Sequence, residues 1–336
     1  MGKTNLIASI ARPVRRALLS ITLCVATALL AQLAYAQQWP ARPVRMVVPY
    51  PAGGPADVLA RVAAAYFSEA LGQQFVVDNR GGANGNIGAI ITAKAPADGY
   101  TFMFATTGPL ALNKLMYKSA TFDPERDFAP VILFGEVSLI VVANPALPVK
   151  NLRELVALAR ANPGKLTYAS PSFGSIGHLS AELIQRSAGF KLTHVPYKGS
   201  APAAADLIGG SVNLCFDLAT TYVQYVKAGT VRALATTAAV RSIALPDVQT
   251  VIESGISGYQ ATGWFGITAP AGTPQEVILR LNRVANTYLA SAEGVTRLRD
   301  FGVRALGGTP ADMAEFIRSE IAKWRPVIEP IAAQLE

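Results

Sequence analysis

The chain has 336 residues, of which 51% are hydrophobic and 15% are charged, and its formal net charge at pH 7 is +8. This length suffices for about two ordinary domains, and the large apolar fraction excludes an intrinsically disordered protein. Two cysteines are too few for a disulfide scaffold or a cysteine-based zinc site, and the basic excess raises the question of a nucleic-acid partner.

The first 36 residues have the three parts of a secretory signal peptide. Four basic residues and no acid precede Ala17, an uncharged stretch runs from 17 to 33, and Ala34-Tyr35-Ala36 supplies the small residues of a cleavage site. Cleavage after Ala36 lowers the net charge to +4. We therefore expect an exported, periplasmic protein that begins at Gln37. The alternative is a retained membrane anchor, but the stretch is shorter than the roughly 20 apolar residues that span a bilayer.

The basic residues of the mature chain are scattered and form no stripe interleaved with aromatic residues. Nucleic acid is therefore not an expected partner. Glycines and prolines interrupt the uncharged stretch from 254 to 275, so no membrane-spanning helix is expected there. The single cysteine of the mature chain, Cys215, lies in an apolar run and is expected to be a buried small hydrophobe.

In the first part of the mature chain, short apolar runs alternate with apolar residues at helical spacing. The expected elements are strands at 44–48, 75–77 and 101–106 and helices at 59–70 and 87–94. This alternation is typical of parallel sheets covered by helices. The glycine-rich segment 82–88 does not match the dinucleotide-binding fingerprint, and we interpret it as a tight loop with close helix packing.

The pattern starts again after residue 138. The expected elements are strands at 139–143, 166–169, 193–195, 212–217, 231–236 and 264–268 and helices at 151–160, 178–188, 201–208, 274–290, 292–301 and 310–323. No polar linker separates the two parts, so we expect strands rather than a flexible tether to join them.

Three loops that follow predicted strands are rich in Gly, Ser and Thr. They contain Ala52-Gly53-Gly54, Thr106-Thr107-Gly108-Pro109 and the segment 170–175. A helix start has free backbone N–H groups and a partial positive charge, and ligands bind at the carboxyl ends of parallel strands. Ordinary loops have a similar composition for turn and capping reasons. It is the occurrence of such loops in both halves that favours an anion site.

The sequence contains neither of two common catalytic motifs, the G-x-S-x-G elbow and the G-x-x-x-x-G-K-[ST] phosphate-binding loop. Ser175 and His178 are three residues apart, which invites a nucleophile–base interpretation. No acid that would orient the imidazole is evident nearby, so a buried, hydrogen-bonded histidine is the expected role, and His194 is also expected to be structural. An exported serine hydrolase remains an alternative to a chain that is not an enzyme.

A series of short motifs occurs in a fixed order over almost the whole mature chain. The motifs are Val48-Pro49-Tyr50-Pro51-Ala52-Gly53-Gly54-Pro55-Ala56-Asp57, Asp78-Asn79-Arg80-Gly81-Gly82-Ala83-Asn84-Gly85, Ala97-Asp98-Gly99-Tyr100-Thr101, Phe122-Asp123-Pro124, Asn162-Pro163-Gly164-Lys165-Leu166, His194-Val195-Pro196-Tyr197-Lys198-Gly199 and Trp264-Phe265-Gly266. This set resembles the substrate-binding receptors of tripartite tricarboxylate transporters, often called Bug-type receptors. Two positions depart from the residues usual in that family: Ser172-Phe173, where Gly and a small or polar residue are usual, and Gly81, where Pro is common. The bulk of Phe173 bears on the identity of the ligand and not on the fold.

The resemblance implies an α/β fold like that of type II periplasmic binding proteins, with two lobes joined by crossing strands and a ligand cleft between them. It divides the mature chain into a first lobe (37–138), a second lobe (139–262) and a return to the first lobe with the C-terminal helices (263–336). Asp217 would accept a hydrogen bond from a ligand amine or hydroxyl. The implied ligand-binding residues are Tyr50, Ala52, Gly53, Gly54, Asp57, Thr106, Thr107, Ser170, Ser172, Gly174, Ser175, His178 and Asp217.

The function implied by the resemblance is that of a solute receptor. It would capture a mono-, di- or tricarboxylate or an acidic amino acid and deliver it to the membrane permease subunits of a tripartite transporter. We expect a monomer without cofactor or metal. A receptor that passes its closed form to a signalling partner is the alternative within the same class.

Overall fold

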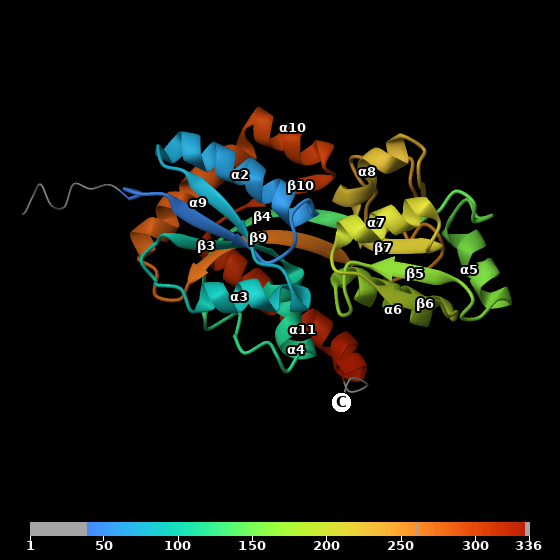
Figure 1. Ribbon diagram of the computed structural model, residues 1–336. Helices are drawn as coiled ribbons and strands as arrows, with labels where there is room; N and C mark the ends of the chain where they lie inside the picture. The colour runs from blue at the N-terminus through green and yellow to red at the C-terminus, as the bar shows by residue number, and fades with distance from the viewer. Residues whose placement is uncertain (1–38, 260, 333–336) are drawn as a thin grey trace, which may run out of the picture. The chain divides into compact units, whose positions relative to one another are not determined.

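The computed structural model describes residues 39–259 and 261–332, and Pro43–Glu336 form one compact unit (Figure 1). The expected signal peptide, residues 1–36, lies outside the described residues. None of the helices that the structure describes combines the length and the apolar character needed to cross a bilayer.

The first lobe is built on β1 (Val44–Val48), which lies between the parallel strands β2 (Phe75–Asn79) and β3 (Thr101–Thr106). Four of the five β1 residues are buried, as expected for a strand covered on both faces. β9 (Thr262–Pro270) continues the sheet antiparallel to β3. The helical segments of this lobe are α2 (Pro55–Leu71), η1 (Ala83–Gly85), α3 (Asn86–Ala93), η2 (Gly108–Leu112), α4 (Asn113–Met116), α9 (Gln275–Ala290), α10 (Ala292–Asp300) and α11 (Pro310–Ala332).

The second lobe repeats the arrangement on a smaller scale. Its central strand, β5 (Thr167–Ser170), pairs in parallel with β6 (Thr193–Pro196) and β7 (Leu214–Leu218). The remaining elements of this lobe are α5 (Leu152–Ala161), α6 (Ile176–Ala188), α7 (Ser200–Gly209), α8 (Ala219–Lys227) and β8 (Arg232–Thr236). Each lobe has its own aromatic core: the rings of Phe104 and Phe134 are 5.1 Å apart in the first lobe, and those of Tyr168 and Phe216 are 5.4 Å apart in the second.

One long strand, β4 (Phe128–Ala143), belongs to both lobes. Its residues up to Ser138 pair with β9, and part of the same stretch pairs with β10 (Val303–Gly307). From Leu139 onward β4 pairs instead with β7 and β8. Figure 1 shows β4 and β9 running between the two groups of strands. The predicted α/β fold of two lobes joined by crossing strands is confirmed, and the lobe boundaries at 138/139 and 262/263 remain proposals.

Two strands differ from the sequence prediction. β4 begins at Phe128 rather than at 139. The chain stays in the sheet at Pro130 and Gly135 because its pairing with β9 shifts register there. β10 was not predicted at all. Only one of its five residues is buried, so its sequence shows no apolar run. Its pairing partner, β4, is far away in the sequence, so no local pattern predicts the strand.

Candidate functional site

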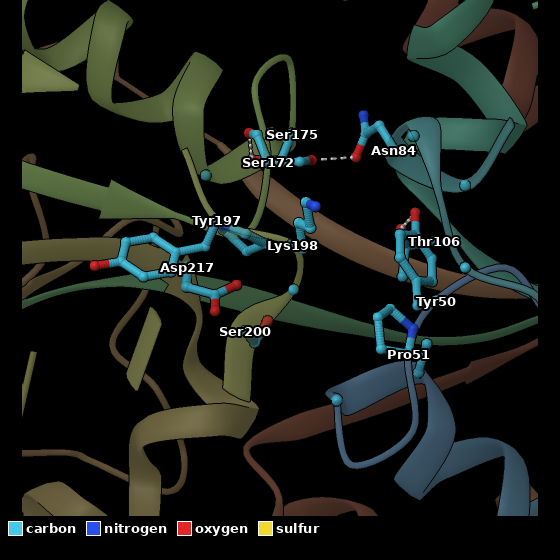
Figure 2. Close-up of a pocket in the computed structure, with 18 of the residues that line it drawn as sticks. Tyr50, Pro51, Asn84, Thr106, Ser172, Ser175, Tyr197, Lys198, Ser200 and Asp217 are labelled. Atoms are coloured by element: carbon cyan, nitrogen blue, oxygen red, sulfur yellow. Dashed lines mark hydrogen bonds between the residues drawn. The ribbon is translucent and has the colours of Figure 1, made fainter. Parts of the chain in front are cut away.

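A cavity of about 770 Å³ lies between the two lobes, within the range usual for small-ligand pockets (Figure 2). Most of its walls are segments that follow the ends of β1, β2, β3, β5, β6 and β7. The lining comprises residues 50–52, 54–56, 81–85, 106, 108 and 117 of the first lobe and 171–173, 175–177, 197–202, 217 and 218 of the second.

The loop after β1 is held in shape by its own polar groups. The Tyr50 hydroxyl and Thr106 Oγ1 are 2.6 Å apart, which joins the loops after β1 and β3. Burial raises the pKa of Tyr50 above its ordinary value, so this phenol stays protonated. Asp57 turns back to accept the Gly53 N–H at 2.9 Å and forms an ion pair with Arg61 at 2.9 Å.

The N-termini of several helices line the cavity, among them those of α2, α6 and α7. The N-caps of α2 and α7 are glycines, Gly54 and Gly199, and neither supplies a side-chain cap hydrogen bond. α6 is capped by Ser175, whose Oγ accepts the His178 N–H at 3.3 Å. Uncapped N–H groups and the helix dipole favour an anion, and here two such ends come from different lobes.

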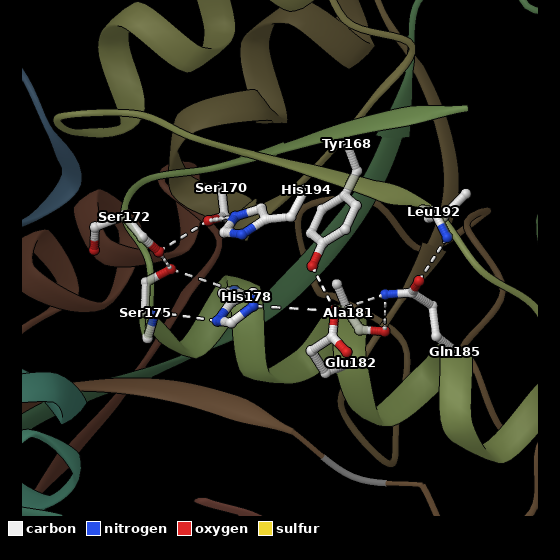
Figure 3. A network of polar contacts seen from close by, with 11 residues as sticks. Tyr168, Ser170, Ser172, Ser175, His178, Ala181, Glu182, Gln185, Leu192 and His194 are labelled. Carbon is white, nitrogen blue, oxygen red and sulfur yellow. Dashed lines mark hydrogen bonds and ion pairs between the residues drawn. The ribbon is translucent and has the colours of Figure 1, made fainter. Parts of the chain in front are cut away.

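A polar network supports the loop after β5 from behind (Figure 3). The Ser170 hydroxyl donates to the Ser172 carbonyl at 2.9 Å and lies 2.7 Å from His194 Nε2. The rings of His178 and His194 are stacked with centroids 4.2 Å apart. Burial lowers the pKa of His178 to about 4 and, together with the neighbouring His178, that of His194 to about 3. Both imidazoles are therefore neutral at pH 7.

The geometry does not favour the nucleophile–base interpretation of Ser175 and His178. The Ser175 hydroxyl donates to the Ser172 carbonyl at 2.8 Å and caps α6 through the backbone of His178. His178 Nδ1 accepts the Gly174 N–H at 3.1 Å, so this nitrogen cannot take a proton from the serine. Within residues 39–259 and 261–332, no three His, Cys, Asp or Glu side chains come together to hold a metal ion.

The two lobes contact each other directly beside the cavity. The Ser172 hydroxyl of the second lobe donates to Asn84 Oδ1 of the first at 2.7 Å, and Asn84 Nδ2 donates to the Gly174 carbonyl at 3.3 Å. The Tyr117 hydroxyl also donates to the Phe173 carbonyl. Asn84 thus bridges the glycine-rich segment of the first lobe and the loop after β5.

Asp217, at the end of β7, is a buried acid on the cavity wall, with 2% of its surface exposed. Its Oδ1 accepts the Leu218 N–H at 2.7 Å, and its Oδ2 has no hydrogen-bond partner among the described residues. Burial raises the pKa of Asp217 to about 7, against the opposing effects of the Ser200 hydroxyl and the Leu218 amide. This carboxyl is therefore partly protonated near neutral pH.

Seven of the thirteen residues expected to bind ligand line the cavity: Tyr50, Ala52, Gly54, Thr106, Ser172, Ser175 and Asp217. The other six lie outside the lining: Gly53, Asp57, Thr107, Ser170, Gly174 and His178. They are engaged in shaping the loops. For example, Thr107 Oγ1 accepts the Trp264 N–H of β9 at 3.2 Å and is fully buried.

Sequence reasoning missed three parts of the wall: Asn84, Tyr117 and the segment 197–202. The last had a usable signal, because Tyr197-Lys198-Gly199-Ser200 follows a predicted strand and precedes a predicted helix, as the other loops do. Asn84 was hidden in a segment interpreted as a packing loop. That interpretation describes the glycines well, since a Cβ on Gly88 would lie 2.7 Å from Pro49 Cα.

Comparison with known proteins places the chain in a family. The family model described as "Tripartite tricarboxylate transporter family receptor" matches residues 59–333. Protein BugT of Bordetella pertussis is 38% identical over 322 residues, which cover 96% of this chain and 99% of BugT.

Two solved structures are also similar. A protein of R. palustris solved with adipate has 43% sequence identity and a TM-score of 0.85 over 86% of this chain and 97% of its own. MatC from Rhodopseudomonas palustris, solved with bound malate, has 32% identity and a TM-score of 0.81 over 87% of this chain and 100% of its own. The chain belongs to the tripartite tricarboxylate transporter receptor family, as its motifs predicted.

Proposed function

We propose that this member of the tripartite tricarboxylate transporter receptor family captures a small carboxylate between its lobes and delivers it to membrane permease subunits. The observation that carries the proposal is the convergence of helix N-termini from both lobes on one cavity of about 770 Å³. Micromolar binding requires about 8 kcal/mol. Each helix end contributes about 0.3–2 kcal/mol, so hydrogen bonds and lobe closure must supply most of the rest.

The proposed contacts divide into two groups. The residues on the wall would touch the ligand: Tyr50, Ala52, Gly54, Thr106, Ser172, Ser175 and Asp217. The residues outside the lining would hold those contacts in place: Gly53, Asp57, Thr107, Ser170, Gly174 and His178. Ser175 has no proposed catalytic role, because its hydroxyl serves as a helix cap.

Similar structures holding adipate and malate guide the choice of ligand. Purified mature protein is titrated calorimetrically with straight-chain dicarboxylates of four to nine carbons, malate, citrate, acidic amino acids and aromatic monocarboxylates. Saturable binding of a carboxylate, with no comparable binding of the matching diamide, is the expected result. A panel in which no carboxylate binds would overturn the proposed function.

The location and the partners are proposed on the same basis. We expect export, removal of residues 1–36 and a monomeric mature protein, which intact mass and light scattering of the periplasmic fraction test together. For the permease, the expected result is loss of uptake of the bound carboxylate when either the receptor or the neighbouring permease genes are deleted. Uptake that persists while a carboxylate-dependent transcriptional response is lost would instead support a signalling receptor.

A further inference from the structure

The described residues that line the cavity include two charged side chains, Lys198 and Asp217. Lys198 is exposed, and within the described part of the chain its ammonium group has no hydrogen bond or ion pair. The first-lobe arginines that follow β1 and β2 are engaged instead: Arg61 of α2 pairs with Asp57, and Arg80, after β2, pairs with Asp78. The cavity therefore contains a cation that the protein itself leaves unpaired.

The backbone on both sides of Lys198 is fixed. The Tyr197 N–H donates to the Ser170 carbonyl at 3.0 Å, and the Gly199 N–H donates to the Pro171 carbonyl at 2.8 Å. The Tyr197 hydroxyl donates to Asp206 in α7 at 2.6 Å. A long, free side chain thus projects from an anchored segment, and in Figure 2 it points toward the first-lobe residues across the cavity.

Asp217 does not neutralise this lysine. One of its carboxylate oxygens accepts the Leu218 N–H and the other has no partner. An ammonium group is a compact charge with three donors, and it gains most when it pairs with a carboxylate in a site that closes away from water. An uncompensated cation in a cavity walled by helix N-termini selects anionic ligands over neutral ones of the same shape.

We propose that Lys198 is a specificity-determining residue that provides the counter-charge for a ligand carboxylate from the second lobe. The inference rests on the proposed function and adds to it the residue that balances the ligand's charge: Lys198 pairs with one ionised carboxylate and discriminates against a hydroxyl or an amide at that position. The amide and hydroxyl donors of the helix ends then orient the ligand, and Lys198 supplies the discrimination by charge.

The test compares the affinity of wild type, K198M and K198R for adipate, or for malate if adipate does not bind, at several salt concentrations. Lys191→Met is the matched control, since Lys191 is an exposed lysine of the same lobe outside the cavity lining. We expect K198M to bind about tenfold to a hundredfold more weakly and to lose part of its salt dependence, and K198R to keep part of the affinity. K191M should bind like wild type.

The melting temperature of K198M should equal that of wild type, because the side chain has no partner to lose within the described residues. A K198M variant that binds the dicarboxylate as tightly as K191M, with an unchanged salt dependence, overturns this inference and leaves the proposed function standing. Failure of wild type to bind any carboxylate overturns both.

Discussion

At the scale of single residues, Gly54 offers the cleanest probe of the loop after β1. Its φ of −82° and ψ of 169° suit any residue, including one that precedes proline. A Cβ placed there meets one protein atom within 4 Å, the Pro51 carbonyl oxygen at 3.6 Å, and Gly54 lines the cavity. We expect Gly54→Val to fold normally and to weaken carboxylate binding at least tenfold, as measured by calorimetry and melting temperature. Unchanged affinity with an intact fold would show that this loop does not approach the ligand.

The Asp217 carboxyl should make stability depend on pH in an unusual direction. Burial raises its pKa from an ordinary 3.8 to about 7, so folding favours the protonated form. That stabilisation is complete below about pH 4 and is lost as the pH rises through 7. The titratable neighbours do not compensate: burial raises the pKa of the Cys215 thiol and of Tyr222, which keeps both neutral, and Lys198 lies exposed on the cavity.

Asp217→Asn keeps an acceptor for the Leu218 N–H and cannot ionise. The free energy of unfolding of this variant, relative to wild type, should therefore increase between pH 5 and pH 8, as followed by denaturant titration at each pH. Identical pH profiles for the two proteins would show that Asp217 stays ionised and paired in solution.

The expected ligand-binding residues that lie outside the cavity lining show what local sequence patterns leave out. The family resemblance implied that Ser170 and His178 bind the ligand, and both lie next to the loop after β5: Ser170 is the last residue of β5, and His178 is in the first turn of α6. Spacing along the chain does not say how deep a side chain sits. Ser170 turns toward His194, which is 24 residues away in the sequence, and the stack of His178 on His194 fills the space behind the loop.

At the scale of elements, the segment 82–85 is a strained connection that holds the lobes together. Four consecutive residues have positive φ, including the non-glycine residues Ala83 at 47° and Asn84 at 53°. Asn113 fixes the segment, since its Nδ2 donates to the Asn84 carbonyl at 2.8 Å. Strain of this kind persists where surrounding contacts enforce it, and here the enforced result is the pair of bonds from Asn84 to Ser172 and Gly174.

We use the term latch for the hydrogen bonds from Asn84 to Ser172 and Gly174. The variant Asn84→Gly removes these bonds and also the backbone strain, because glycine adopts the left-handed conformation without cost and has no side chain to reach the second lobe. We expect the ligand-free variant to open, with a larger radius of gyration by X-ray scattering than wild type, and to bind about three- to twentyfold more weakly. Ser172→Ala removes the partner hydroxyl, and the double variant should lose little beyond either single one. Superimposable scattering curves for ligand-free wild type and Asn84→Gly would exclude a latch.

The elements that the sequence predicted are those with a local signal: buried runs such as 44–48, amphipathic helices and glycine-rich turns. Among the elements that it missed, helix α8 (Ala219–Lys227) has an amphipathic pattern of its own, whereas two strand segments depend on distant partners. β10 is held by pairing with residues more than 160 positions earlier, such as Arg304 with Glu136, and the first half of β4 reads as a broken apolar pattern. The bridging role of Asn84 likewise exists only once both lobes are placed.

At the scale of the whole molecule, the two lobes share the strand β4. Its first half pairs with β9 in the first lobe, and its second half pairs with β7 in the second lobe. A lobe cannot unfold without freeing one half of this strand, and Pro43–Glu336 accordingly form one compact unit. We therefore expect a single cooperative unfolding transition in which a bound ligand protects both lobes. At a ligand concentration one hundred times Kd, the added stability should be about 2.7 kcal/mol.

The chain provides an independent probe for each lobe. Trp264 in β9 and Trp324 in α11 are buried in the first lobe, and the buried Cys215 in β7 is the sole cysteine after residue 36. With Trp39 replaced by Phe, tryptophan fluorescence follows the first lobe and labelling of the Cys215 thiol follows the second. The two probes should give the same midpoint in denaturant, and carboxylate should shift both equally. Earlier labelling of Cys215, or a ligand shift in one probe alone, would mean that the crossing strands join the lobes without coupling their folding.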